Sequence, residues 1–163
     1  GVFPDEDLAI TKNSPITKAI NSNFLIFDYA TDYYYKNNIE DINDFKLTDS
    51  DFKGFKNFLS SNNFTFETNT EKSLSKVLIA AEKEELDSAI QKDYNTLLAN
   101  LNTSKSKAID ENKDQILGLL TDEIVKRHTY REGLYEYYKT HNIEIKKATE
   151  ILANPSKYAS YLK

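Results

Sequence analysis

The residue types that carry most enzyme chemistry are sparse in this chain. It has no cysteine, which excludes a thiol nucleophile and a cysteine-ligated zinc site. Its two histidines, His128 and His141, have no second histidine or cysteine at ligand spacing, and no His-Glu-x-x-His pattern occurs. It contains neither a glycine-rich phosphate loop nor a Gly-x-Ser-x-Gly elbow. The sequence therefore predicts no catalytic residue, no metal site and no cofactor.

Paired carboxylates are the remaining groups that could do acid–base work or hold a divalent cation. Glu82 with Glu85, and Asp110 with Asp114, have the spacing that places two carboxylates on one face of a helix. Charged residues make up 29% of the chain, so such pairs also arise on any solvated helix face balanced by lysines. We favour the solvated face, because neither pair stands apart from its surroundings.

The compositional oddity is the number of aromatic residues, eleven Tyr and nine Phe, with no Trp and no Met. Two dense groups stand out as a candidate surface for protein contact: Tyr33, Tyr34, Tyr35, Tyr135, Tyr137 and Tyr138. Aromatic side chains are enriched at protein interfaces, and they equally fill helical cores. Because consecutive residues on a helix point in different directions, some of the six must face solvent or a partner.

The charge balance excludes several classes of partner. Twenty-one basic residues stand against 26 acidic ones, which gives a net charge of −5. A negative surface repels nucleic acid and anionic lipid, and only two residues, Arg127 and Arg131, are arginine. No apolar run reaches the roughly 18–20 residues of a membrane span. We therefore expect neither nucleic-acid binding nor membrane insertion.

The elements that must position these residues are predicted to be helices, because only four Gly and three Pro interrupt the chain. Ser14 with Pro15, and Thr48 with Asp51, are typical helix starts. Helical spacing predicts helices over 15–36, 48–61, from 70 onward, 86–138, 143–153 and 155–162. The expected fold is all-α, an irregular helical bundle with two long antiparallel helices and an extended N-terminal arm over residues 1–12.

Two positions in the long helical region are predicted to interrupt it. The apolar stripe slips in phase near residues 82–85, where a kink or a short break would absorb the slip. Residues 100–104, Asn-Leu-Asn-Thr-Ser, are weak helix sequence and suit a turn. Two long antiparallel helices are the preferred interpretation, and one unbroken helix over residues 86–138 is the alternative.

A resemblance to a known family runs along nearly the whole chain. Its motifs are Gly1-Val2-Phe3-Pro4-Asp5, Ser14-Pro15-Ile16, Leu25–Thr31, Tyr33–Lys36, Asp44–Asp49, Glu123–Arg127, Ile145–Ala148 and Ala153–Tyr158. With these motifs the chain resembles the C-terminal helical region of C-terminal processing peptidases, or tail-specific proteases, of the Bacteroidetes type. The residues Phe27-Asp28-Tyr29-Ala30 are the most specific part of the match.

The resemblance implies a parent serine peptidase with a Ser-Lys dyad and a PDZ domain that captures apolar C-termini. Both catalytic residues lie upstream in that family, so none is assigned in this chain. Residues 1–12 are then a remnant of the peptidase core, with Val2, Phe3 and Pro4 at its junction, and residues 13–163 form the C-terminal helical domain. The implied location is the periplasm or cell envelope of a Gram-negative bacterium.

The leading hypothesis is thus a non-catalytic accessory domain that serves packing, substrate gating or assembly of such a peptidase. Its expected partners are the upstream peptidase and PDZ domains of the same polypeptide, protein substrates, or a second copy. The alternative is a stand-alone helical adaptor that binds another protein through its aromatic face. An independent enzyme that uses paired carboxylates is the least favoured hypothesis.

Overall fold

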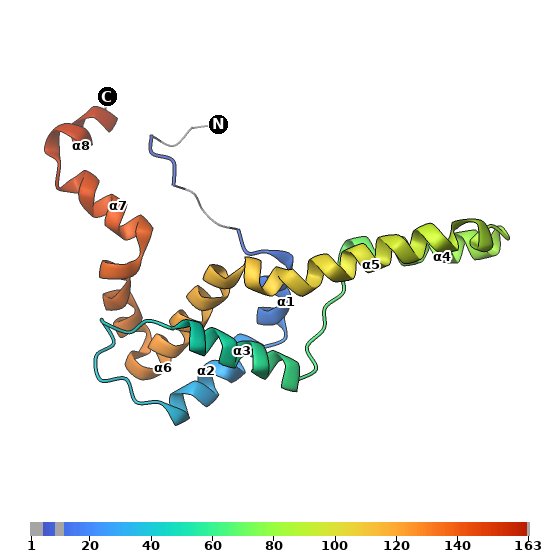
Figure 1. Ribbon diagram of the computed structural model, residues 1–163. Helices are drawn as coiled ribbons and strands as arrows, with labels where there is room; N and C mark the ends of the chain where they lie inside the picture. The colour runs from blue at the N-terminus through green and yellow to red at the C-terminus, as the bar shows by residue number, and fades with distance from the viewer. Residues whose placement is uncertain (1–4, 9–11, 163) are drawn as a thin grey trace.

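The structure is a computed structural model that describes residues 5–8 and 12–162. Within these ranges the chain forms helices and no strand, which confirms the all-α class (Figure 1). The helices are α1 (Pro15–Ser22), α2 (Leu25–Lys36), α3 (Asp49–Ser61), α4 (Asn69–Lys83), α5 (Asp87–Glu111), α6 (Lys113–His141), α7 (Ile143–Leu152) and α8 (Pro155–Tyr161).

The predicted helix starts are confirmed by their capping geometry. The Ser14 hydroxyl accepts a hydrogen bond from the Thr17 N–H, and Pro15 opens α1. At α3, the Thr48 side chain accepts from the Asp51 N–H, and the Asp51 carboxylate accepts from the Thr48 N–H at 2.7 Å. These reciprocal bonds satisfy backbone groups that the first helical turn leaves free.

The helix predicted over residues 15–36 is wrong in one respect, because it divides into α1 and α2. Asn23 ends α1, and Phe24 adopts a left-handed conformation with φ 59°. The change of direction turns Leu25 and Ile26 into the core and leaves Phe24 largely exposed. Tertiary packing therefore decides this boundary, since the apolar spacing alone continues across it.

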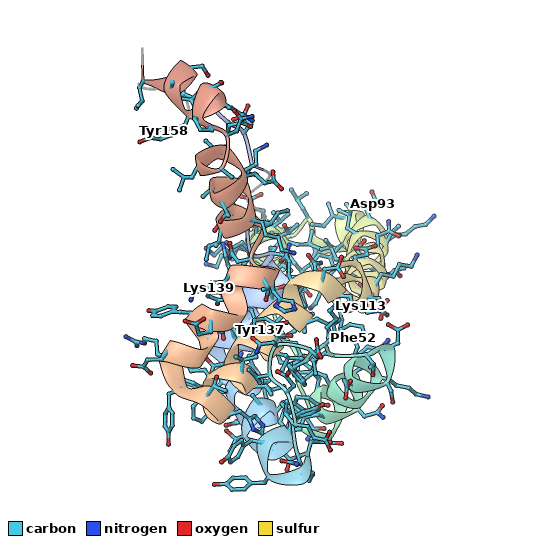
Figure 2. All side chains as sticks on the ribbon, turned by 90° about the vertical axis from the view of Figure 1, so that its left-hand side faces the viewer. Phe52, Asp93, Lys113, Tyr137, Lys139 and Tyr158 are labelled. Atoms are coloured by element: carbon cyan, nitrogen blue, oxygen red, sulfur yellow. The ribbon has the colours of Figure 1, made fainter. Side chains whose placement is uncertain are left out.

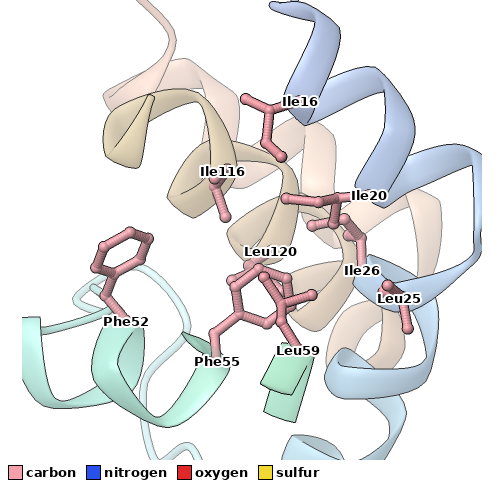
Figure 3. Packing of buried hydrophobic residues seen from close by; sticks show 9 residues of the cluster. All are labelled: Ile16, Ile20, Leu25, Ile26, Phe52, Phe55, Leu59, Ile116 and Leu120. Carbon is pink, nitrogen blue, oxygen red and sulfur yellow. The ribbon is translucent and has the colours of Figure 1, made fainter. Parts of the chain in front are cut away.

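The main core lies where α1, α2, α3 and α6 meet. Its buried members come from α1, α2 and α3 and from α6, which is far from them in sequence (Figure 3): Ile16, Ile20, Leu25, Ile26, Phe52, Phe55, Leu59, Ile116 and Leu120. Burying each of these side chains contributes roughly 1.5–3 kcal/mol before the entropy of ordering is subtracted. The apolar stripes predicted for the first and second helical regions thus face one another.

Helices α4 and α5 form a long antiparallel hairpin that projects from this body (Figure 1). The phase slip predicted near residues 82–85 coincides with the turn between α4 and α5. At this turn the chain reverses direction, and Glu85 has φ 57°. The turn predicted at residues 100–104 is wrong, because α5 is helical to Glu111. The Thr103 hydroxyl donates to the Ala99 carbonyl, and just beyond this stretch the Ser106 hydroxyl donates to the Thr103 carbonyl, so both side chains bond to the helix backbone.

The region from residue 86 to 138 forms two long helices and not one, as preferred from the sequence. The break falls at Asn112, between α5 and α6, and redirects the chain back into the body. The helix that lies antiparallel along α5 is α4, and α6 packs along α2. Apolar stripes indicate which face of a helix is buried, and only the structure shows which helix covers it.

Candidate protein-contact surface

The packing of α2 against α6 positions most of the tyrosines that the sequence analysis selected. Ala30 of α2 is fully buried against Ile124 and Val125 of α6, in a second apolar cluster that also holds Phe45. The small Ala30 side chain lets the two helices approach closely. The residues next to it on α2 therefore lie against α6 or at its edge.

Arg127 of α6 holds the outer edge of this contact. Its guanidinium donates to the Thr31 hydroxyl at 3.1 Å and to the Phe27 carbonyl oxygen at 3.0 Å. It also forms a 2.6 Å ion pair with Glu123 on its own helix. The guanidinium lies 4.3 Å from the centre of the Phe27 ring, a cation–π contact. One side chain thus fixes the backbone and the aromatic ring of the neighbouring helix.

The electrostatics of Glu123 follow from this arrangement. Burial raises the pKa of its carboxyl, but hydrogen bonds from Lys126 and Arg127 outweigh burial and leave the pKa below its usual value. Glu123 is therefore ionised at neutral pH and keeps Arg127 in place. The Glu123–Arg127 spacing of four residues is a signal for such a pair that can be read from the sequence.

The structure divides the six selected tyrosines into two groups of three. Tyr137 is buried and donates from its hydroxyl to the Phe45 carbonyl at 3.1 Å, while Tyr33 is half-buried with its ring 6.1 Å from that of Phe45. Tyr138 is half-buried, and burial together with a hydrogen bond to Asp122 raises the pKa of its hydroxyl. These three tyrosines stabilise the fold.

The other three tyrosines face solvent. Tyr34, Tyr35 and Tyr135 have exposed fractions of 39%, 80% and 57%. The ring of Tyr34 lies 5.3 Å from Tyr35 and 4.7 Å from the imidazole of His128 on α6. Figure 2 labels Tyr137 on α6, the helix that packs against α2.

We define the aromatic surface as the connected set Phe27, Tyr34, Tyr35, Arg127 and His128. Phe27 is half-exposed, although its spacing in the sequence placed it on the apolar stripe. Burial lowers the pKa of His128, so its imidazole is neutral at pH 7. Its Nε2 atom is buried and lacks a hydrogen-bond partner among the described residues. The surface is therefore aromatic, and its one cation, Arg127, is largely buried and paired with Glu123.

The carboxylate pairs considered from the sequence do not form a site. Glu82 and Glu85 are exposed at the tip of the hairpin, and Asp110 forms an ion pair with Lys56 at 2.7 Å. Asp114 lies beyond the break at Asn112, on the next helix. Over residues 5–8 and 12–162, no group of three or more acidic or histidine side chains is placed to hold a metal ion.

The N-terminal arm is described at residues 5–8 and 12, and the junction residues Val2, Phe3 and Pro4 lie outside the described residues. Glu6 accepts a hydrogen bond from Lys147 of α7 at 3.2 Å and further hydrogen bonds from Lys157 and Tyr161 of α8. Through Glu6 the arm thus contacts the C-terminal helices α7 and α8.

Comparison with known families agrees with this architecture. The family model of the "Probable PDZ-protease, C-terminal helical domain" matches residues 16–152. Because the match covers most of the chain, the protein belongs to this family of helical domains, which form part of PDZ-proteases. No curated protein and no solved structure matches the chain. None of the helices in the described part of the chain is long and apolar enough to cross a membrane.

Proposed function

We propose that this chain is the non-catalytic C-terminal accessory domain of a C-terminal processing serine peptidase in the bacterial periplasm. Its aromatic surface contacts the upstream peptidase and PDZ domains of the same polypeptide. Membership in a family of PDZ-protease helical domains supports the parent class. The observation that carries the contact is that Phe27, Tyr34 and Tyr35 are exposed while Arg127 holds their helix in a defined position.

The composition of the aromatic surface is that of a protein-binding surface. Tyrosine and arginine dominate the binding energy of protein interfaces, because they bury a large area and keep a polar tip for hydrogen bonding. The neutral, half-buried imidazole of His128 lies beside Tyr34, so a partner that covers this surface does not have to desolvate a charged imidazole. A contact here serves packing, substrate gating or assembly of the peptidase equally well.

The test is a double substitution, Tyr34→Ala with Tyr35→Ala, in the parent polypeptide. We expect the turnover of a peptide with an apolar C-terminus to change several-fold, or the melting temperature to fall by several degrees. Tyr158→Ala is the matched control, because Tyr158 is similarly exposed on α8. If the double variant and the control both behave like the unmodified enzyme, the proposed contact is wrong.

The stand-alone adaptor remains the second hypothesis, since the same aromatic surface would serve it. An immunoblot of source cells with antibody raised against this chain separates the two. A band several times larger than 18.8 kDa supports the accessory domain. A sole band near 18.8 kDa that begins at its own initiator methionine, as read by N-terminal sequencing, supports the adaptor.

A further inference from the structure

Helix α7 carries an apolar stripe that the described part of the chain leaves open. Ile145, Ala148 and Leu152 recur at spacings of three and four residues, so they share one face of the helix, and all three are exposed. No residue of α7 is buried. The helices that α7 contacts most are its neighbours in sequence, α6 and α8, and Figure 1 shows α7 and α8 extending away from α1, α2 and α3. Such a stripe stabilises a fold when another element covers it.

The N-terminal arm contacts a different side of the same helix. Glu6 accepts a hydrogen bond from Lys147 of α7 at 3.2 Å, and hydrogen bonds from Lys157 and Tyr161 attach it to α8. Lys147 stands two residues after Ile145, and at about 3.6 residues per turn this spacing places the two side chains on nearly opposite sides of the helix. Glu6 therefore joins the arm to α7 without covering the stripe.

This contact fixes where the polypeptide enters the domain. Five residues precede Glu6 in the chain, and five fully extended residues span at most about 18 Å. An α-helix with its side chains is about 10–12 Å across. A domain that precedes these residues therefore begins within reach of the uncovered side of α7.

We propose that the domain immediately upstream of this chain in the polypeptide docks on the stripe formed by Ile145, Ala148 and Leu152. The inference rests on the proposed function, because it requires that the chain continue into the upstream domains of a PDZ-protease. It adds a contact on α7 to the one proposed for the aromatic surface on α2 and α6. Glu6 then holds the arm on one side of α7 while the upstream domain covers another, so α7 sets the orientation between the two domains.

Covalent attachment favours the upstream domain over a second copy or a free partner. Stable interfaces between separate proteins bury about 1,200–2,000 Å² in total, which is more than three side chains of one helix provide. A domain held by a short connection needs a smaller contact, because the connection keeps it at a high effective concentration beside the helix. The small area of the stripe and the position of Glu6 thus select the same occupant.

Site-specific photocrosslinking in the parent polypeptide tests the contact. Leu152 is replaced by the photoreactive amino acid p-benzoylphenylalanine. Leu86, at the tip of the α4–α5 hairpin, is replaced in the matched control, because the two residues are 64% and 51% exposed. We expect light to link position 152 to a segment upstream of residue 1 in the same polypeptide, with at least about 10-fold more product than position 86 gives. Peptide mapping by mass spectrometry identifies the linked segment.

The outcomes separate this inference from the proposed function. A link from position 152 to a second copy or to another protein overturns the inference, and so do equal upstream links from both positions or no link at all. If Tyr34→Ala with Tyr35→Ala still alters the enzyme as expected, the proposed function stands without the contact on α7. A sole immunoblot band near 18.8 kDa that begins at its own initiator methionine overturns both.

Hydrogen exchange measures the burial of the same helix. The amides of α7 should exchange at least about 10-fold more slowly in the parent polypeptide than in this chain alone. In the parent, Leu152→Glu should restore the faster exchange, because the new carboxylate opposes burial of the stripe. In this chain alone the same substitution should leave exchange in α7 nearly unchanged, since Leu152 is exposed there. Equal exchange of α7 in the two unmodified proteins would show that no upstream domain covers it.

Discussion

Glu71 of α4 joins its helix to α5 through a charged contact. Its largely buried carboxylate accepts from Lys105 of α5 at 2.7 Å and from the Thr68 N–H at 2.6 Å. The ammonium of Lys105 also lies 4.9 Å from the centre of the Phe66 ring. These contacts fix the root of the hairpin, where α4 begins beside α5.

The ion pair makes the stability of the hairpin root depend on pH. The hydrogen bond from Lys105, followed by that from Thr68, lowers the pKa of Glu71 from 4.5 to about 2. Because the folded pKa lies below the unfolded one, the carboxylate stabilises the folded chain above about pH 4.5 and loses this effect as the pH falls toward 2. We expect Glu71→Gln to remove this part of the pH dependence.

The measurement is urea unfolding of both proteins between pH 7 and pH 2. The difference in unfolding free energy should be constant above about pH 4.5 and shrink toward pH 2. Glu6 titrates in the same range, but it is present in both proteins and cancels in the difference. A difference that is independent of pH would contradict the assigned role of Glu71.

Helix α6 depends on a kink that reorients its second half. Tyr130 has φ 59° and ψ −165°, a conformation that residues other than glycine rarely adopt. Gly133 follows the kink. A Cβ atom on Gly133 would lie only 2.0 Å from the Cβ atom of Thr129, so the Thr129 side chain already occupies that space. The kink brings Leu134 and Tyr137 into the second apolar cluster. Gly133 is therefore a structural requirement of this helix.

Two glycines of α6 allow a matched prediction. Gly133→Ala should destabilise the protein by about 1–3 kcal/mol, because the new methyl group overlaps Thr129. Gly118→Ala should stabilise it by about 0.5–1 kcal/mol, since no atom lies within 4 Å of the new Cβ and alanine favours the helix. Urea unfolding of the two variants measures both effects. Effects of equal sign would mean that the kink does not exclude a Cβ.

The N-terminal arm and the C-terminal helices, far apart in sequence, are joined by one contact. Glu6 of the N-terminal arm accepts hydrogen bonds from Lys147, Lys157 and Tyr161, which belong to α7 and α8. The same contacts, led by that from Lys157, lower the pKa of Glu6 to about 2. Neither α7 nor α8 contains a buried residue, so little apolar packing holds these helices and the contact with Glu6 is a main restraint on their position.

Removing the charge should release the C-terminal helices. With Glu6→Gln we expect faster amide hydrogen exchange in α8 and unchanged exchange in α3, since α3 belongs to the main core. Asp7→Asn removes the neighbouring exposed carboxylate and serves as the control. Hydrogen exchange followed by mass spectrometry resolves the two regions. Unchanged exchange in α8 would show that the arm does not hold it.

The sequence by itself determined the helical class, the capped starts at Ser14 and Thr48, and the two long helices after residue 86. These features depend on local spacing and on side chains that bond to their own backbone, so no distant contact is needed to predict them. The split of α1 from α2 at Phe24 and the helical state of residues 100–104 were missed. At Phe24, packing of Leu25 and Ile26 into the core outweighs the local spacing. Residues 100–104 stay helical on the exposed hairpin, where the Thr103 hydroxyl bonds to the backbone one turn back.

The tertiary structure alone decided which tyrosines are available to a partner. Tyr35 and Tyr137 belong to equally dense groups in the sequence, yet the first is exposed and the second is buried against Phe45. The difference depends on how α2 crosses α6 and on the kink at Tyr130, neither of which has a local signal. The spacing of apolar residues indicates which face of a helix is buried. Which other helix packs against that face depends on the whole folded chain.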